Sequence, residues 1–396
     1  MGAGGETVRL AGVNWYGFEC DPMVAGGLDL KTVGDICHLI VDLGFNHIRL
    51  PYCHQMLVDN PRITNGLAAN PVLQGRTAVE VMDEVIAEAS RHGLRVVLDN
   101  HRSEAGWSAQ ENGLWYSRRF TENDWLQSLR FMADRYKDNQ TVVGIDLRNE
   151  PGSPAIDPDQ FPKNGGAVWG APDRLGTRWP RDWAAAAERG GNEVLKVNPN
   201  LLIFVEGVRG DPAGPFFDGQ CHSYWPGGNL CGVRSKGGRR RAARPIKLRI
   251  PGRLVYSVHD YGPDMHAEMP WCQANSTAET AAASRSVWEQ TWGFIARQGI
   301  APIYVGEFGT PNGVVQADNS APGHVTDTDR SSTQAKWFNY LIDYMNELEV
   351  SWAYWCLNGD QPLNTGRRAA QPELYGILRS DWSGPASALM EKLVQL

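Results

Sequence analysis

Eight short apolar runs recur along the chain, and most of them end in polar residues. The runs lie at residues 8–15, 45–51, 94–101, 142–150, 201–207, 254–261, 301–308 and 351–358. Most are apolar without alternation, which is typical of strands that neighbouring strands and helices cover on both faces. The pattern predicts eight buried strands.

Stretches with helical periodicity separate these runs. Apolar residues recur at helical spacing at residues 78–93, 124–138, 182–198 and 332–348, and Gly or Pro then precedes the next apolar run. This alternation indicates repeated βα units around a parallel sheet. Eight units in 396 residues fit the α/β class and one (β/α)8 TIM barrel. We expect a single domain over residues 1–396, closed by a helix at residues 386–396.

Two long insertions interrupt the regular alternation. We expect loops at about residues 152–180 and 208–253, and the second is rich in Gly and Arg. The stretch from Ser235 to Arg249 contains the only run of like charges. We interpret it as a solvated loop, with a polyanion-binding patch as the alternative.

Composition narrows the range of partners. The formal net charge of -7 gives no broad basic field of the kind that nucleic acid or an anionic membrane selects. No apolar run reaches the ~20 residues that a membrane span needs. We expect a neutral or small partner and a monomer. We also expect no cofactor, because the sequence contains no cofactor motif. The N-terminus lacks signal-peptide features, so the protein either stays in the cytoplasm or has lost its signal.

The cysteines do not form a metal-binding pattern. They stand at positions 20, 37, 53, 221, 231, 272 and 356 without a C-x-x-C pair, so we expect no structural zinc site. An odd count leaves at least one thiol unpaired. Cys221 and Cys231 lie in one loop-like stretch, and a local disulfide between them is one possibility.

Polar side chains close six of the apolar runs. In a (β/α)8 barrel, the C-terminal ends of the strands meet at one face, where catalytic residues lie. Ionisable groups without partners are costly to bury in a core. We therefore predict one pocket that contains Arg49, His101, Asn149, Glu150, His259, Tyr261, Glu307 and Trp355.

Two of these residues carry the chemistry that acetal hydrolysis needs. One carboxylic acid must protonate the leaving oxygen, and one carboxylate must attack or activate water. Glu150 and Glu307 fit these roles as a pair, although either alone would fit a salt bridge at the barrel rim. Glu206, which closes the fifth run, is the main competitor, and we expect it to lack the Asn, Tyr and Arg neighbours of the other two.

The neighbours of the pair suggest supporting roles. Arg49 and Tyr261 can hydrogen-bond one carboxylate and keep its pKa low, as a nucleophile requires. His101 and His259 can orient groups or bind sugar hydroxyls, with an ordinary hydrogen-bonding role as the alternative.

Several motifs together resemble glycoside hydrolase family 5. They are "GVNWYGFE" from Gly12, "IRLPY" from Ile48, "LRNEP" from Leu147, "VYSVHDYGP" from Val255 and "VGEFG" from Val305. The similarity covers nearly the whole chain and is greatest to bacterial endo-β-1,4-glucanases. It implies a secreted, retaining enzyme that cuts a β-glucan polysaccharide or oligosaccharide internally by double displacement.

The resemblance also implies residue roles. Glu150 matches the acid/base and Glu307 the nucleophile. Asn149 would hold the 2-hydroxyl, and Trp355 would form the floor of subsite -1. The rest of the shell around that sugar would be Arg49, His101, His259 and Tyr261.

Tryptophan is abundant, with 15 copies. An indole can stack on a pyranose or fill a core. Trp15, Trp115, Trp169 and Trp225 lie where a cleft could place them, so they are candidates for further sugar platforms, with packing as the alternative.

Other functions stay open within and outside the family. A β-mannanase, xyloglucanase, glucosylceramidase or exo-β-glucosidase would share the same catalytic pair. A non-catalytic carbohydrate-binding barrel would be favoured by a missing carboxylate, but both are present. The sequence lacks G-x-S-x-G and H-E-x-x-H, which argues against a serine hydrolase and a metalloprotease.

Overall fold

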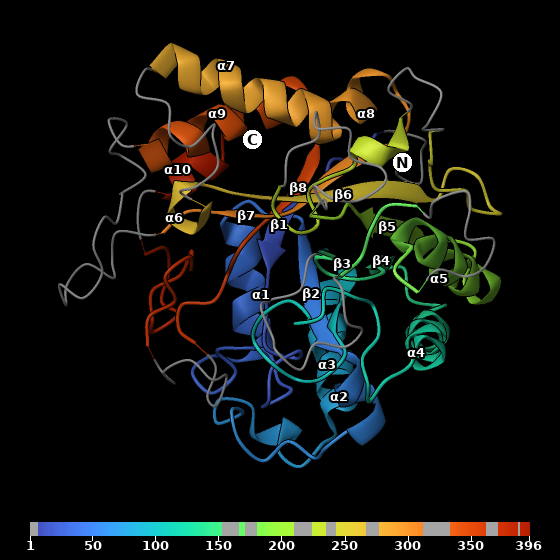
Figure 1. Ribbon diagram of the computed structural model, residues 1–396. Helices are drawn as coiled ribbons and strands as arrows, with labels where there is room; N and C mark the ends of the chain where they lie inside the picture. Colours follow the sequence, from blue (N-terminus) through green and yellow to red (C-terminus); the bar gives the residue numbers. More distant parts are fainter. Residues whose placement is uncertain are drawn as a thin grey trace.

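Eight parallel strands close into a barrel in the order of the sequence. The computed structural model describes residues 7–152, 166–170, 180–209, 224–234, 243–266, 277–311, 333–361, 371–386 and 389–396. The first strand pairs with the last, which completes the ring (Figure 1). The predicted (β/α)8 fold is therefore confirmed. The strands are β1 Ala11–Asn14, β2 His47–Cys53, β3 Arg95–Arg102, β4 Val142–Asp146, β5 Leu202–Glu206, β6 Leu254–Tyr261, β7 Ile303–Gly309 and β8 Ser351–Tyr354.

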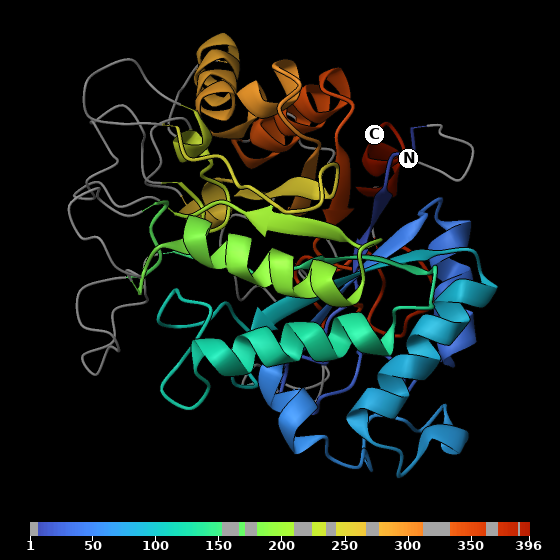
Figure 2. The ribbon, with the colours of Figure 1, turned by 90° about the vertical axis from the view of Figure 1, so that its right-hand side faces the viewer.

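Helices form the outer layer around this barrel (Figures 1 and 2). The larger ones are α1 Val33–Asp42, α3 Ala78–Arg91, α4 Glu122–Arg135, α5 Trp183–Val197, α7 Thr277–Trp288 and α9 Thr333–Glu347. Short helices are α2 His54–Asp59, η1 Pro71–Leu73, η2 Cys231–Val233, α6 Pro263–His266, the π-helix η4 Glu289–Gly293, α8 Phe294–Arg297 and the C-terminal α10 Leu389–Leu393. All four helices predicted from periodicity are present.

Side-chain caps fix where the helices of one flank begin. Thr77 accepts from the backbone N–H of Glu80, and the Glu80 carboxylate accepts from the backbone N–H of Thr77, which satisfies two free donors of α3. Thr121 and Asp124 form the same arrangement at the start of α4. These caps define the first residues of α3 and α4.

Three buried tryptophans join α4 and α5 to the barrel. The Trp125 indole donates to Leu147 O at 2.9 Å, just beyond β4, and the Trp183 indole donates to Glu206 O at 2.8 Å, at the end of β5. Trp115 packs 5.5 Å from Trp183 between ring centroids. The two helices lie side by side (Figure 2), so this cluster holds the ends of β4 and β5 in place.

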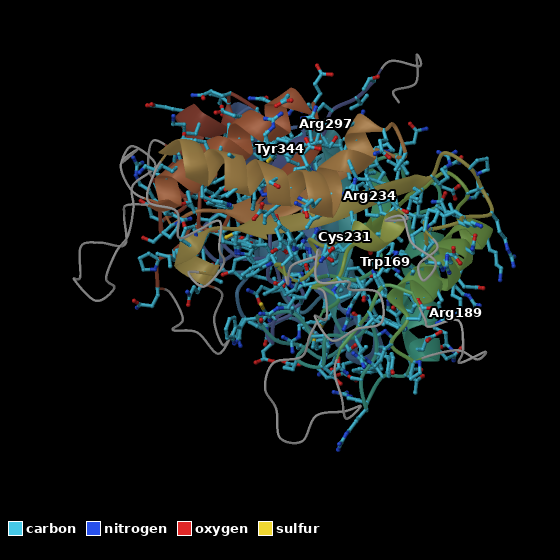
Figure 3. All side chains as sticks on the ribbon, turned by 45° about the horizontal axis from the view of Figure 1, so that its top comes forward. Trp169, Arg189, Cys231, Arg234, Arg297 and Tyr344 are labelled. Carbon is cyan, nitrogen blue, oxygen red and sulfur yellow. The ribbon has the colours of Figure 1, made fainter. Side chains whose placement is uncertain are left out.

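The two predicted insertions are described only in part. Between β5 and β6, residues 224–234 contain η2, and the N–H of Leu230 donates to Thr291 O of the π-helix at 3.0 Å. Cys231 is disulfide-bonded, and Figure 3 shows it beside Trp169. Its partner, the proposed partner Cys221 and most of the Arg-rich run lie outside the described residues.

The remaining described cysteines are buried and form no disulfide: Cys20, Cys37, Cys53 and Cys356. In the part of the chain that the structure describes, none of the helices combines the length and the apolar character that crossing a bilayer requires.

Candidate active site

A single buried arginine organises the charged centre of the barrel. Arg49 is fully shielded from solvent. Its Nη1 donates to Glu307 Oε1 at 2.8 Å, and its Nη2 donates to Asn149 Oδ1 at 3.0 Å and Glu206 Oε1 at 3.1 Å. Glu307 lies in β7, Asn149 lies in the loop after β4, and Glu206 lies in β5. One guanidinium therefore links three parts of the barrel.

Two more carboxylates and one amide complete the surroundings of Arg49. Asp99 Oδ1 and Asp146 Oδ2 both lie 3.2 Å from Nη2. Asn14 Oδ1 accepts from Nη1 at 2.9 Å, while Asn14 Nδ2 donates to Gly306 O at 2.8 Å and Tyr354 O at 3.2 Å. Burial acts against the charge of Arg49, but the four carboxylates raise its pKa well above the usual range.

Glu307 lies in β7 and is held from two sides. Arg49 bonds its Oε1, and the hydroxyl of Tyr261 donates to its Oε2 at 3.0 Å, as the sequence predicted. The direction of the pKa shift differs from the expectation. Burial raises the pKa of Glu307 above the usual glutamate value, although His259 and Arg49 act to lower it. The cost of removing this carboxylate from water exceeds the effect of its cationic neighbours.

Glu150 lies in the loop after β4, because that strand ends at Asp146. Its φ of 49° is in the left-handed region, and its backbone N–H donates to Glu206 Oε2 at 2.7 Å. Its Oε1 accepts from the Trp225 indole at 2.5 Å and lies 3.0 Å from His259 Nδ1. The carboxylate, with only 10% of its side chain exposed, thus lies between Trp225 and His259.

Glu150 and Glu307 approach each other beside His259. One carboxylate oxygen of each, together with a ring nitrogen of His259, lies within 4.8 Å of the other two. His259 Nδ1 is 3.6 Å from Glu307 Oε2. The sequence prediction that residues from β4 and β7 would converge is confirmed.

A second chain of contacts leads from Asn149 to the rim. Asn149 Nδ2 lies 3.3 Å from His101 Nε2, and His101 Nδ1 lies 2.6 Å from Asp99 Oδ2. Burial opposes a charge on His101, but Asp99 raises its pKa. Trp355, directly after β8, stacks on His101 with ring centroids 5.8 Å apart and on Tyr16 at 5.3 Å. The indole is held in a fixed orientation between these two rings.

Sequence comparison places this site in a known family. A family model described as cellulase, glycosyl hydrolase family 5, matches residues 2–361. The chain belongs to glycosyl hydrolase family 5. The resemblance inferred from the motifs is thereby confirmed.

Individual members of family 5 are similar over nearly the whole chain. The endoglucanase of Paenibacillus polymyxa is 34% identical, with 96% of this chain and 80% of that protein covered. The major extracellular endoglucanase of Xanthomonas campestris pv. campestris is 33% identical, with 96% of this chain and 66% of that protein covered.

Two solved family 5 structures share the architecture. The catalytic domain of the Xanthomonas enzyme superposes with a TM-score of 0.75 at 31% identity, covering 99% of this chain and 96% of that chain. A complex of endocellulase from Pyrococcus horikoshii with cellotetraose gives a TM-score of 0.77 at 30% identity, covering 98% and 92%. This chain is therefore a glycoside hydrolase barrel of family 5.

Two predictions about the charged residues of this family 5 site need correction. Arg49 does not end its strand, because it is the third residue of β2 and β2 continues to Cys53. Glu206 does not lack polar company, since its carboxylate contacts Arg49 and the backbone of Glu150. Sequence reasoning underrated Glu206, although its place at the end of β5 was the available signal.

Three of the tryptophans proposed as sugar platforms are buried in packing instead. Trp15 is fully buried and donates to Gly26 O at 3.0 Å, and Trp115 belongs to the cluster with Trp125. Trp169 donates to Arg244 O at 2.8 Å. No face of these indoles is open to a sugar, so the expectation is wrong for all three. Trp225 is half-buried and packs 4.6 Å from Tyr261 between ring centroids.

The catalytic centre also has the composition of a metal site. Among the described residues, Glu150, His259 and Glu307 could offer three ligand atoms to a cation. Each of the three already has another partner. Trp225 bonds Glu150, Glu206 lies beside His259, and Arg49 bonds Glu307 and supplies positive charge there.

Proposed function

We propose that this family 5 enzyme is a retaining endo-β-1,4-glucanase, with Glu307 as the nucleophile and Glu150 as the acid/base. The observation that carries the proposal is the approach of their carboxylate oxygens to within 4.8 Å. Retaining glycosidases hold the two carboxyls about 5–5.5 Å apart, because the nucleophile must reach the anomeric carbon without an intervening water. Inverting enzymes need about 6.5–9.5 Å.

The surroundings support this division of roles. Arg49 and Tyr261 hold both oxygens of Glu307, which orients the carboxylate, and Arg49 offsets part of the rise in its pKa that burial causes. In the first step, Glu307 attacks the anomeric carbon while Glu150 gives its proton to the departing sugar oxygen. In the second, Glu150 takes a proton from water, which attacks the same carbon and releases Glu307.

The substrate-binding proposals follow from the groups beside the pair. Asn149 is fixed by Arg49 and lies beside His101, so its amide is oriented to bond a sugar hydroxyl. Trp355 offers an indole stacked on His101, which lies beside Asn149, and it would form the floor of the subsite that holds the reacting sugar. Trp225 would contact the leaving-group side, because its indole N–H already bonds Glu150.

The substrate class is supported by what the relatives are. The similar Paenibacillus and Xanthomonas proteins are endoglucanases, and the Pyrococcus endocellulase was solved with cellotetraose. We infer a β-1,4-glucan chain as the substrate. The Xanthomonas relative is extracellular, and a disulfide at Cys231 suits an oxidising compartment. We propose that this enzyme also acts outside the cell, as a monomer.

Cleavage of barley β-glucan and carboxymethylcellulose tests the activity. We expect the viscosity to fall faster than reducing ends appear, because internal cuts shorten chains quickly. Turnover of β-mannan alone, or of monosaccharide glycosides alone, would overturn the endoglucanase proposal and leave the catalytic pair intact.

Azide rescue tests the two roles. With an activated aryl β-cellobioside, Glu150→Ala should give a β-azide product, because the covalent intermediate still forms and azide enters where water did. Glu307→Gly should give an α-azide, because azide replaces the nucleophile and attacks once. Reversed anomers would exchange the two roles.

A further inference from the structure

Glu206 contacts both halves of the catalytic machinery without facing the pocket. It is the last residue of β5 and is fully buried. Its Oε2 accepts the backbone N–H of Glu150 at 2.7 Å. Its Oε1 lies 3.1 Å from Arg49 Nη2 and 3.2 Å from His259 Nε2. Each of these groups in turn contacts Glu150 or Glu307.

The bond to Glu150 holds an unfavourable backbone conformation. Glu150 has a φ of 49°, which residues other than Gly adopt rarely and at an energetic cost. The bond from its N–H to a charged, buried acceptor is of the stronger kind. This backbone conformation directs the Glu150 side chain, so the Glu206 carboxylate helps to determine where the acid/base points.

The loop between β5 and β6 leaves room for the carboxylate at one position. Gly227 has a φ of 80°, and a Cβ added there would lie 2.3 Å from Glu206 Oε2 and 3.6 Å from Glu150 Cα. The Gly227 carbonyl accepts from the N–H of Gly207 at 2.7 Å, directly after Glu206. A side chain at position 227, which is not part of the charged cluster, would therefore displace the Glu206 carboxylate.

His259 forms a second link between Glu206 and Glu150. Its Nδ1 lies 3.0 Å from Glu150 Oε1, and its Nε2 lies 3.2 Å from Glu206 Oε1. A neutral imidazole has one N–H, so a ring with a carboxylate at each nitrogen favours the doubly protonated form. Burial acts against this charge, but Glu206 and Glu307 raise the pKa of His259 well above its usual range. The ring then donates from Nδ1 to Glu150 Oε1, while its charge attracts Glu206 Oε1, which lies 3.2 Å from Nε2 without hydrogen-bond geometry.

We propose that Glu206 is a positioning residue for proton donation, holding Glu150 through its backbone N–H and through His259. The proposal rests on the assignment of Glu150 as the acid/base. It predicts a selective defect: without Glu206, departure of a leaving group that needs a proton should suffer more than departure of one that does not.

Two aryl β-cellobiosides measure this selectivity. A 2,4-dinitrophenolate leaves without protonation, whereas phenolate needs the acid. In Glu206→Gln, the side-chain amide can accept on one side only and presents N–H groups to a donor on the other. We expect kcat/KM to fall at least about tenfold more for the phenyl than for the dinitrophenyl substrate, a part of the ~10²- to 10⁴-fold contribution of general acid catalysis.

Gly227→Ala provides a second route to the same defect. It changes no charge and pushes on Glu206 Oε2, so it should also slow the phenyl substrate more than the dinitrophenyl one. Asp146→Asn is the matched control. Asp146 also bonds Arg49, but its Oδ1 has no hydrogen-bond partner among the described residues. Both substrates should be affected by the same factor in this control.

The reference variant separates the two proposals. Glu150→Ala should slow the phenyl substrate far more than the dinitrophenyl one, and equal effects would overturn the assignment of Glu150. If Glu150→Ala shows the selective defect while Glu206→Gln and Gly227→Ala slow both substrates equally, the positioning role of Glu206 is wrong. A selective defect in Asp146→Asn as large as that in Glu206→Gln would also overturn the positioning role of Glu206, because the loss of any carboxylate around Arg49 would then produce the same defect.

Discussion

Replacement of Arg49 by methionine should test the charged centre directly. The change keeps an unbranched side chain of similar bulk and removes the cation. In the folded protein, four buried carboxylates would then face an apolar group: Asp99, Asp146, Glu206 and Glu307.

The size of the effect follows from the loss of one partner in a buried ion pair, which costs about 3–5 kcal/mol. For 396 residues, the entropy of unfolding near Tm is about 0.8 kcal/mol/K, so this cost corresponds to a Tm lowered by about 4–6 °C. Domains are stable by about 5–15 kcal/mol in total, so the variant should fold with a small margin.

The deficit of Arg49→Met should grow with pH. Burial and Glu206 already raise the pKa of Asp146 well above its usual range, and Arg49 acts to lower it, so loss of Arg49 raises the pKa of Asp146 further. A carboxyl whose pKa is higher in the folded than in the unfolded protein contributes most below its unfolded pKa of about 4. That contribution is lost as the pH rises through the folded pKa. The variant should therefore be closer to wild type at pH 5 than at pH 7.

Thermal unfolding followed by circular dichroism at pH 5 and pH 7 measures both effects. Arg130→Met is the control, because Arg130 is 47% exposed and pairs with Glu193 at the surface. Such pairs contribute about 0–1 kcal/mol, so this variant should change little at either pH. A deficit of Arg49→Met below 1 kcal/mol, or equal at both pH values, would refute the reasoning.

Three further predictions concern single side chains. Trp355→Ala should lower kcat in steady-state assays, because the indole would hold the distorted sugar; an unchanged kcat with a raised KM would place Trp355 outside the reacting subsite. Tyr261→Phe removes a donor to Glu307 worth about 1.5–3 kcal/mol, so kcat/KM should fall about 10- to 150-fold. The acid limb of its pH profile of kcat/KM should move to higher pH, because the ionised form of Glu307 loses a hydrogen bond. A fall in kcat/KM of less than about threefold would contradict this prediction. Trp115→Ala should cost about 3–5 kcal/mol in denaturant unfolding with an unchanged KM for cellotetraose; a raised KM would return Trp115 to the cleft.

The sequence predicted the barrel and the approach of Glu150 and Glu307 to each other because both follow from local rules. Eight apolar runs separated by helical stretches leave one common architecture, and catalytic groups in such barrels lie at the C-terminal face. Arg49 was misplaced because a strand covered on both sides shows no alternation. Its pattern therefore does not reveal which residues point into the barrel, or how far the strand continues.

The errors with Glu206 and Trp15 have a different physical origin. An indole suits a sugar platform and a core equally well, and only contacts distant in sequence decide which face Trp15 uses. The role of Glu206 depends on a backbone N–H at Glu150 and on the absence of a side chain at Gly227. Neither is a property of the residues next to Glu206 in the sequence.

The contacts of Asn14 bear on when the enzyme becomes active during its synthesis. Its amide joins the carbonyls of Gly306 and Tyr354 to the guanidinium of Arg49, so the seam between the first and last strands is part of the charged centre. Arg49 and Glu307 are 258 positions apart, and β8 follows both. We therefore expect a chain that contains Glu150 and Glu307 to stay inactive until β8 pairs with β1, so that the appearance of hydrolysis reports closure of the ring.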